Sequence, residues 1–171
     1  MNEIRPAVAE DGPSILQMVR ALQTERRVGS PDALSETLIR NALFGRVPSV
    51  RAFVAETGVS LAGLAFYAPS FSIFRAGPAL HVDFVYVKPS YRGSGVARAL
   101  LAAIAGYGRD HGIGAITWLS ARAGEHEERL VASLGVRPHD NLRFVRVPIA
   151  SFERRGIGSL PWSQKASRQP A

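Results

Sequence analysis

The chain has 171 residues, 46% of them hydrophobic, which fits one domain with a substantial core and excludes a disordered polymer. Cysteine is absent, which excludes disulfides, thiolate catalysis and cysteine-ligated zinc, and no apolar run approaches the roughly 20 residues that span a bilayer. The net charge is +7, but aromatic residues do not interleave with the basic ones, so we expect neither a membrane span nor specific binding of nucleic acid.

The first third of the chain predicts one strand and two helices. Residues 2–8 form the predicted strand, and they lack the order of a secretory signal, so we expect a cytoplasmic protein. Asp11 is the expected N-cap of a helix that ends near Arg26. Ser30 and Pro31 predict the start of a second helix, which ends at Gly45. The apolar positions at helical spacing are Ile15, Leu16, Val19 and Leu22 in the first helix and Leu34, Leu38, Ile39 and Ala42 in the second.

The middle of the chain has the pattern of an antiparallel sheet. Residues 50–56 and 61–68 are two β-type runs, and Thr57-Gly58 between them is a hairpin signal. We expect a loop at residues 76–78, where glycine and proline occur together, and a further strand at 80–87.

The rest of the chain alternates helices and strands. We expect helices at 95–109 and 125–134 and strands at 113–119 and 142–149, which together with the earlier elements predict a mixed α/β fold with helices on both faces of its sheet. One domain should cover residues 1–150, followed by a flexible basic tail at 151–171. From Arg137 onward, seven basic residues stand against two acidic ones, so +5 of the net charge lies in this part.

The most informative segment joins the strand at 80–87 to the helix that follows it. Gly93 and Gly95 stand in this turn, and the unpaired amides of a helix N-terminus attract an anion. Glycine lets the backbone approach phosphate oxygens closely, while Arg92 and Arg98 add positive charge. These residues fit a pyrophosphate-binding turn, but a lone glycine pair fits an ordinary strand-to-helix turn equally well. The segment lacks the Gly-Lys-Ser/Thr ending of a P-loop.

This turn resembles the signature of the GNAT N-acetyltransferase superfamily, which is an Arg or Gln, two residues, Gly, one residue, then Gly or Ala. Arg92, Gly95 and Ala97 fill those three positions. The resemblance implies the GNAT fold, a twisted and mostly antiparallel sheet between helices, with acetyl-CoA as co-substrate and no metal. The residues it implies for the pyrophosphate are Arg92, Gly93, Ser94, Gly95, Val96, Ala97 and Arg98. Val85 and Val87 would face the pantetheine arm, between the strands around Val85 and Trp118.

His81 and Asp83 are the candidate catalytic residues. They lie two apart on the predicted strand, so simple alternation places them on one face, opposite Val82 and Phe84. Thioester aminolysis needs a neutral amine, and a positioned proton acceptor helps to supply it. The resemblance supports either residue, because superfamily members commonly carry a Glu or His base at one of these positions.

The expected general acid is missing. Many relatives carry a tyrosine in the penultimate helix that protonates the departing thiolate, but Val131 stands at that position, and Gly124 replaces the familiar upstream asparagine. Ser133, His126 or water could supply the proton. A non-catalytic acyl-CoA-binding or regulatory protein is therefore an alternative to an enzyme.

The acceptor is less well defined by the sequence. The aromatic stretch 63–74 and the opening residues 4–7 resemble the diamine and polyamine acetyltransferase branch. Phe71 and Phe74 could line an acceptor pocket with His81 and Asp83, or could pack at the interface of a homodimer. Asp83 is the only acidic residue between Gly58 and Asp110, so we expect a small primary amine as acceptor. The basic C-terminal region leaves a protein or tRNA-linked amine as an alternative.

Overall fold

In the computed structural model, the described residues are 3–27, 34–58, 60–73, 76–119 and 125–135. The chain divides into two compact units, Met1–Arg137 and Pro138–Ala171, and the described residues all belong to the first. The strand expected at 142–149 and the tail expected at 151–171 lie outside the described residues. The domain boundary near residue 150 therefore stays a prediction.

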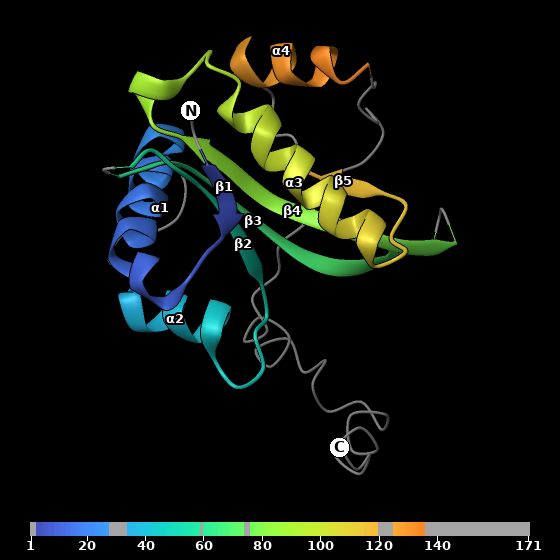
Figure 1. The fold of residues 1–171 in the computed structure, drawn as a ribbon, viewed down its shortest axis with the longest axis horizontal. Coiled ribbons are helices and arrows are strands. Elements are labelled where there is room, and N and C mark those ends of the chain that lie inside the picture. Colours follow the sequence, from blue (N-terminus) through green and yellow to red (C-terminus); the bar gives the residue numbers. More distant parts are fainter. Residues whose placement is uncertain (1–2, 28–33, 59, 74–75, 120–124, 136–171) are drawn as a thin grey trace, which may run out of the picture. The chain divides into compact units, whose positions relative to one another are not determined.

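Within the described residues, five strands form one sheet in the order β1-β2-β3-β4-β5 (Figure 1). Strands β1 to β4 pair antiparallel with their neighbours, and β5 joins β4 in parallel. The strands are β1 (Glu3–Pro6), β2 (Arg51–Glu56), β3 (Leu61–Ser72), β4 (Gly77–Val87) and β5 (Ile116–Trp118). The expected mixed α/β fold with a mostly antiparallel sheet is confirmed.

Strands β3 and β4 form a longer hairpin than the sequence predicts. Gly77 and Pro78, which we expected in a loop, belong to β4, and Pro78 stands opposite Phe71. Proline is compatible with a ladder where its missing N–H is not needed. Pro69 meets this condition, because its partner Leu80 directs its own amide away from β3 and donates at 2.9 Å to Ala115, the residue before β5.

The helices are α1 (Gly12–Arg26), α2 (Glu36–Phe44), α3 (Val96–Asp110) and α4 (Glu125–Ser133). The predicted start of the second helix at Ser30 and Pro31 is wrong. Helix α2 begins at Glu36 because Ser35 is its N-cap, with the Ser35 hydroxyl accepting a hydrogen bond from the Leu38 amide at 3.1 Å. Leu38, expected on the buried face, is 52% exposed.

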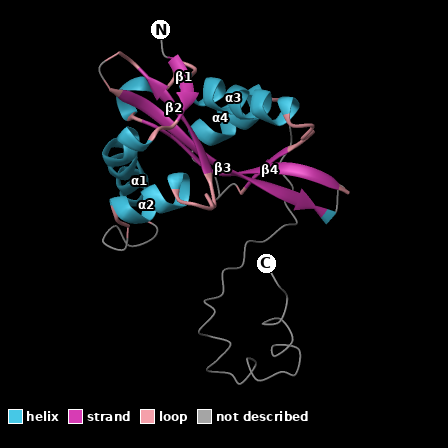
Figure 2. Ribbon diagram, turned by 60° about the horizontal axis from the view of Figure 1, so that its bottom comes forward, coloured by secondary structure: helices cyan, strands magenta, loops and turns pink. Residues whose placement is uncertain are grey.

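The helices cover both faces of the sheet (Figures 1 and 2), and each face has its own hydrophobic core. Helices α1 and α2 pack on one face with the core residues Ile15, Met18, Ile39, Leu43, Val54, Leu64 and Phe66. Helix α3 packs on the other face with the core residues Ala65, Tyr67, Leu80, Val82, Leu100 and Ile104, to which Leu130 of α4 adds a partly buried contact. Burial of these apolar side chains is the main stabilising contribution to the fold.

A β-bulge at Asp83 lets β4 contribute to both cores. Phe66 pairs with Phe84 and Tyr67 with Val82, so Asp83 has no partner on β3. Before the bulge, Leu80 and Val82 face α3, whereas after it Tyr86 belongs to the core under α1 and α2, against which Phe84 also packs. The prediction that Val82 and Phe84 share a face is therefore wrong, because the extra residue reverses the alternation.

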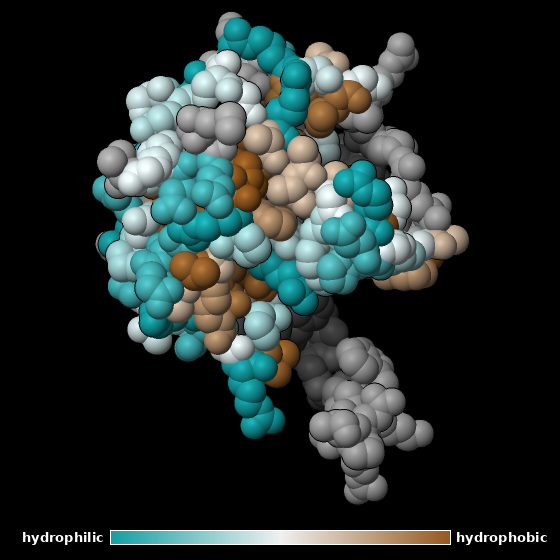
Figure 3. Space-filling view, viewed as in Figure 1, coloured by the Kyte–Doolittle hydropathy of each residue, from teal (hydrophilic) through white to brown (hydrophobic). Residues whose placement is uncertain are grey.

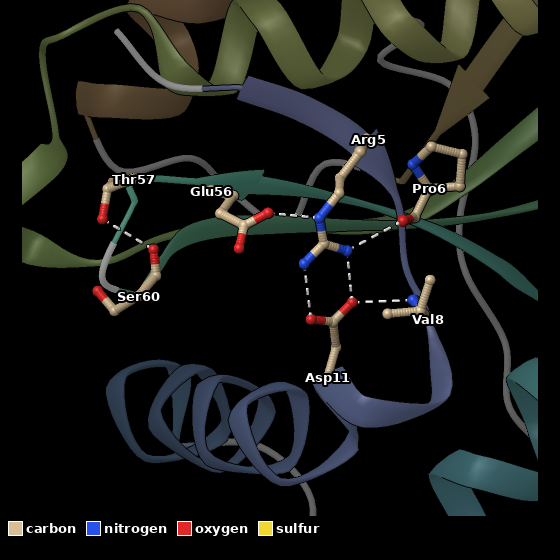
Figure 4. Close-up of polar contacts among 7 residues, drawn as sticks. All are labelled: Arg5, Pro6, Val8, Asp11, Glu56, Thr57 and Ser60. Carbon is tan, nitrogen blue, oxygen red and sulfur yellow. Dashed lines mark hydrogen bonds and ion pairs between the residues drawn. The ribbon is translucent and has the colours of Figure 1, made fainter.

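A charged network ties β1 to the start of α1 (Figure 4). Arg5 donates two parallel hydrogen bonds to Asp11, at 2.8 and 2.9 Å, and a third to Glu56 of β2 at 2.5 Å. Asp11 precedes α1 as predicted, but its carboxylate accepts from the Val8 amide at 2.8 Å instead of capping the helix. Burial raises the pKa of Asp11, and the hydrogen bonds from Arg5 and Val8 outweigh it, so the net pKa lies below the usual range.

The outer surface of the described residues is mixed in character. In Figure 3, apolar side chains on the visible face gather in small groups between larger hydrophilic areas. No helix among the described residues is long and apolar enough to cross a bilayer.

Replacing Asp11 with asparagine should lower the free energy of unfolding by about 2 kcal/mol at pH 7, because the charged hydrogen bonds from Arg5 are lost. The folded-state pKa of Asp11 lies below its unfolded value, so this stabilisation is complete above about pH 4 and is lost as the pH falls through the folded-state value. Urea unfolding followed by circular dichroism measures the free energy of unfolding of both proteins. The difference between wild type and Asp11→Asn should be smaller at pH 2.5 than at pH 7.

The matched control is Glu10→Gln, which removes the neighbouring exposed carboxylate and should change stability little at either pH. If Asp11→Asn lowers the free energy of unfolding equally at both pH values, the role given to the Arg5–Asp11 pair is contradicted.

Candidate functional site

The turn between β4 and α3 is short and internally braced. After β4 ends at Val87, a single 3-10 turn, η4 (Pro89–Tyr91), leads to Arg92. The Tyr91 amide donates to Lys88 at 2.9 Å, and the Ser94 hydroxyl donates to the Tyr91 carbonyl at 2.6 Å. These bonds fix the path of the chain into the glycine-bearing part of the turn.

Gly93 and Gly95 both adopt left-handed backbone conformations, with φ angles of 78° and 86°. A side chain at either position would be strained, which explains glycine here. A Cβ atom added at Gly93 or Gly95 would meet nothing within 4 Å, so these glycines expose the backbone to open space. The turn can therefore be approached closely from outside.

The amides of residues 93–98 have no acceptor among the described residues. The first amide of α3 with a backbone partner is that of Ala99, which donates to the Gly95 carbonyl at 3.0 Å. Six consecutive N–H groups, from Gly93 to Arg98, thus stand at the positive end of a 15-residue helix. This arrangement is suited to binding an anion with several oxygen atoms.

Arg92 does not carry the free charge that the sequence predicts. Its Nε donates to the Val87 carbonyl at 3.0 Å, and its Nη2 lies 2.6 Å from Glu25 Oε2 on α1. Tyr86 donates to the other oxygen of Glu25 at 3.2 Å, and the Arg92 guanidinium lies 5.9 Å from the Tyr86 ring centre. Burial and Glu25 together raise the pKa of Tyr86. Arg92 is held by these contacts, whereas Arg98 is exposed.

Close packing fixes the start of α3 against the sheet. Val96, the first residue of α3, is only 3% exposed, so its side chain belongs to the core and only its amide faces the turn. Gly63 of β3 permits this approach, because a Cβ atom there would lie 2.9 Å from the Val96 side chain. The position of the six amides is thereby linked to the sheet.

Strand β4 has an open edge next to this turn. Strand β5 pairs only with residues 80–82 of β4, so no described strand covers the β4 edge after Val82. The Lys88 amide donates to Ala62 on β3 at 2.9 Å, and by alternation the amides of Val87 and Val85 point away from β3, toward that edge. The side chains of Val85 and Val87 pack partly buried against the α3 core.

His81 lies where β4 and β5 are still paired. It stands opposite Thr117 of β5, and its Nδ1 is 3.3 Å from the Thr117 hydroxyl. The ring is half-buried, and its neighbours Leu80 and Val82 face the α3 core, so His81 points to the other side of the sheet. The Thr117 contact fixes the ring orientation and leaves Nε2 as the nitrogen able to serve a substrate.

The structure brings only some of the other predicted residues together. Asp83 is exposed on the bulge, two residues from His81, between that histidine and the open edge. Phe71 is 68% exposed near the hairpin end and shares the face of Tyr67, opposite to that of His81. Phe71 and His81 therefore lie on opposite faces of the β3–β4 hairpin. Phe74 lies outside the described residues.

The candidate acids on α4 gain no support. Val131 is 9% exposed, so its position is part of the hydrophobic packing. The Ser133 hydroxyl donates to the Leu130 carbonyl of its own helix at 2.7 Å. Gly124 and the His126 side chain lie outside what the structure describes. Among the described residues, no group of three or more His, Cys, Asp or Glu side chains could hold a metal ion.

Sequence reasoning missed four residues that shape this site: Glu25, Gly63, Tyr86 and Thr117. Glu25 is an ordinary acidic residue in the last turn of a helix, and its contact with Arg92 joins positions 67 residues apart. Thr117 could have been found from the parallel register of the two strands, but that register depends on the sheet order. The sequence gives no local signal for either contact.

The sequence model of the acetyltransferase (GNAT) family matches residues 15–136. Thialysine N-epsilon-acetyltransferase of Bos taurus is 29% identical over 117 residues, which cover 64% of this chain and 68% of the bovine protein.

Solved structures share the fold at lower sequence identity. An integron cassette protein from the mobile metagenome of V. cholerae has a TM-score of 0.72 at 18% identity, covering 91% of this chain and 97% of its own. A possible acetyltransferase from Clostridium difficile 630 has a TM-score of 0.71 at 20% identity, covering 87% of this chain and 99% of its own.

Proposed function

This chain belongs to the GNAT acetyltransferase family, and we propose that it transfers the acetyl group of acetyl-CoA to a primary amine of a small molecule. The family match and the bovine relative establish the coarser statement, that the chain is an N-acetyltransferase. The coenzyme, the class of acceptor and the residues involved are the proposed part. The homodimer and the cytoplasmic location expected from the sequence stay predictions.

The observation that carries the proposal is the row of six amides, from Gly93 to Arg98, that have no acceptor in the described part of the chain. Pyrophosphate oxygens are acceptors that such amides can bind, and the left-handed glycines leave room for close approach. Arg98, exposed in the first turn of α3, adds a charged donor. From this turn, the open edge at Val85 and Val87 offers the pantetheine amides a strand to pair with.

The chemical step is a direct attack of the amine nitrogen on the thioester carbonyl carbon. An alkyl amine with a pKa near 10.4 is neutral in only about one molecule in 2,500 at pH 7, so it must lose a proton first. We assign this to His81, through Nε2, or to Asp83 on the bulge, either directly or through a water molecule. Holding the amine and thioester together supplies a further part of the acceleration.

The carbon–sulfur bond then breaks, and the thiolate of CoA leaves with the bonding electrons. Negative charge develops on the carbonyl oxygen before this, and the Val85 amide on the open edge is the donor that we assign to it. The thiolate takes its proton from water or from the base that has accepted the amine proton and is now its conjugate acid. The buried Val131 is excluded from that role.

The acceptor is proposed from charge and from a relative. The bovine protein is named for acetylating the N-epsilon position of thialysine, which supports a primary amine on a small molecule. In this chain, Asp83 is the exposed carboxylate beside the open edge of β4, and it can attract an ammonium group toward the proton acceptor.

The first test replaces Gly95 with alanine. The added Cβ atom enters the space above the amides and forces an L-residue into a left-handed conformation, so the affinity for CoA should fall about tenfold or more. Isothermal titration calorimetry measures the affinity. Gly112→Ala is the control, because Gly112 follows the other end of α3 with a φ of 68° and equally open surroundings.

Both alanine variants should lose similar stability, whereas only Gly95→Ala should lose affinity. Equal affinities for CoA in the two variants would refute the assignment of the coenzyme to this turn, and so would a wild-type protein without measurable binding.

The second test concerns the base. Among His81→Ala and Asp83→Asn, at least one should lower kcat about 100-fold with little change in the affinity for acetyl-CoA, because proton transfer and not coenzyme binding is lost. Thiol release with a panel of small amines provides the rate. His111→Ala, an exposed histidine after α3, is the control and should retain full activity. Unchanged kinetics in both test variants would remove the base assignment.

A further inference from the structure

Glu25 stands out among the residues near the glycine turn, because it is an acidic side chain beside a site proposed for a polyanion. It belongs to the last turn of α1, on the face of the sheet opposite α3. Its two carboxylate oxygens have different partners, Tyr86 for Oε1 and Arg92 for Oε2. Hydrogen bonds from Tyr86 and Arg92 hold the Glu25 carboxylate in place, which indicates a structural role for this acidic residue.

The contacts form a continuous path from α1 to the turn. Tyr86 is 4% exposed and belongs to the core under α1 and α2, so its hydroxyl is a fixed point for Glu25. Glu25 in turn holds the Nη2 side of the Arg92 guanidinium, whose Nε donates to the last carbonyl of β4. The guanidinium is thereby fixed from two sides immediately before Gly93.

Gly93 and Gly95 give the turn little stiffness of their own, because glycine has many accessible backbone conformations. An anion-binding turn binds more tightly when its donors are ordered before the ligand arrives. The clamp made by Glu25, Tyr86 and Arg92 lies directly before the flexible part, where loss of order would affect all six amides.

We propose that Glu25 is a positioning residue for the coenzyme turn, which acts through Arg92 to hold the amides of Gly93–Arg98 ready for the pyrophosphate. This inference rests on the proposed function and adds a residue from a distant helix to it. It assigns Arg92 mainly to the architecture of the turn and leaves the phosphate contacts to the amides and Arg98.

The test is a double-mutant cycle of Glu25→Gln and Arg92→Gln. Each single variant should weaken CoA binding by about three- to tenfold, and the double variant should be no weaker than Arg92→Gln alone, because both changes break the same clamp. Asp110→Asn is the matched control. It removes one negative charge at the far end of α3, about 20 Å away by helix rise, and should leave affinity unchanged.

A second readout does not depend on coenzyme. Backbone ¹⁵N order parameters of Gly93 and Gly95 in the free protein should fall from about 0.85 toward 0.6 in Glu25→Gln, with those of α1 unchanged. This separates positioning of the turn from general support of the helix, and thermal unfolding confirms that the variant is folded.

Each outcome has a definite meaning. Unchanged or tighter CoA binding in Glu25→Gln, or additive losses in the double variant, would overturn the positioning role. If wild-type protein fails to bind CoA while Glu25→Gln still loosens the turn, the proposed function fails and the clamp stands. If the order parameters do not change, the clamp is refuted whatever the affinities show.

Discussion

The site depends on six backbone amides at the start of α3 that have no partner among the residues that the structure describes. Buried N–H groups are almost always paired, so such a row is tolerable only where water or a ligand reaches it. The two left-handed glycines keep that space open, and Gly63 lets Val96 press α3 onto the sheet. The position of glycine thus explains both the close packing of α3 on the sheet and the open space in front of the amides. The result is a row of donors at the positive end of α3 that is available to an anion.

The bulge at Asp83 is the second constraint, since it lets one strand serve two cores and a reaction site. Without an extra residue, Leu80, Val82, Phe84 and Tyr86 would all point to one face. With it, the first pair supports α3 and the second pair faces α1 and α2. The reversal also brings Val85 and Val87 to the α3 side, beside the edge that β5 leaves uncovered. Asp83 is exposed because a bulge residue has no place in either core.

The sequence predicted what local patterns determine and missed what distant contacts determine. The glycine turn, helices α1, α3 and α4 and the antiparallel hairpins follow from periodicity and glycine placement, and the structure confirms these elements. The start of α2 was wrong because serine occurs at both 30 and 35, and it is the Ser35 hydroxyl that accepts a hydrogen bond from the Leu38 amide and caps the helix. The bulge was missed because alternating apolar residues look the same with or without one extra position. The ties from Glu25 to Arg92 and from His81 to Thr117 depend on tertiary neighbours that no local signal reveals.

The reaction can proceed without a tyrosine at position 131. This follows from comparing two proton transfers, the removal of a proton from the amine and the protonation of the departing thiolate. At pH 7 an alkyl amine with a pKa near 10.4 is more than three pH units below half-deprotonation. A thiol has a pKa near 8.5, which is only about 1.5 pH units above pH 7. A thiolate can therefore leave without a general acid at a small cost in free energy. At 1.36 kcal/mol per unit, removing the amine proton is the larger demand by about 2.6 kcal/mol. The chain keeps candidate bases on β4, His81 opposite Thr117 of β5 and Asp83 next to the open edge, and has only a packed valine at the position of the acid. This distribution matches the demand, because the group that is missing is the one the chemistry needs least.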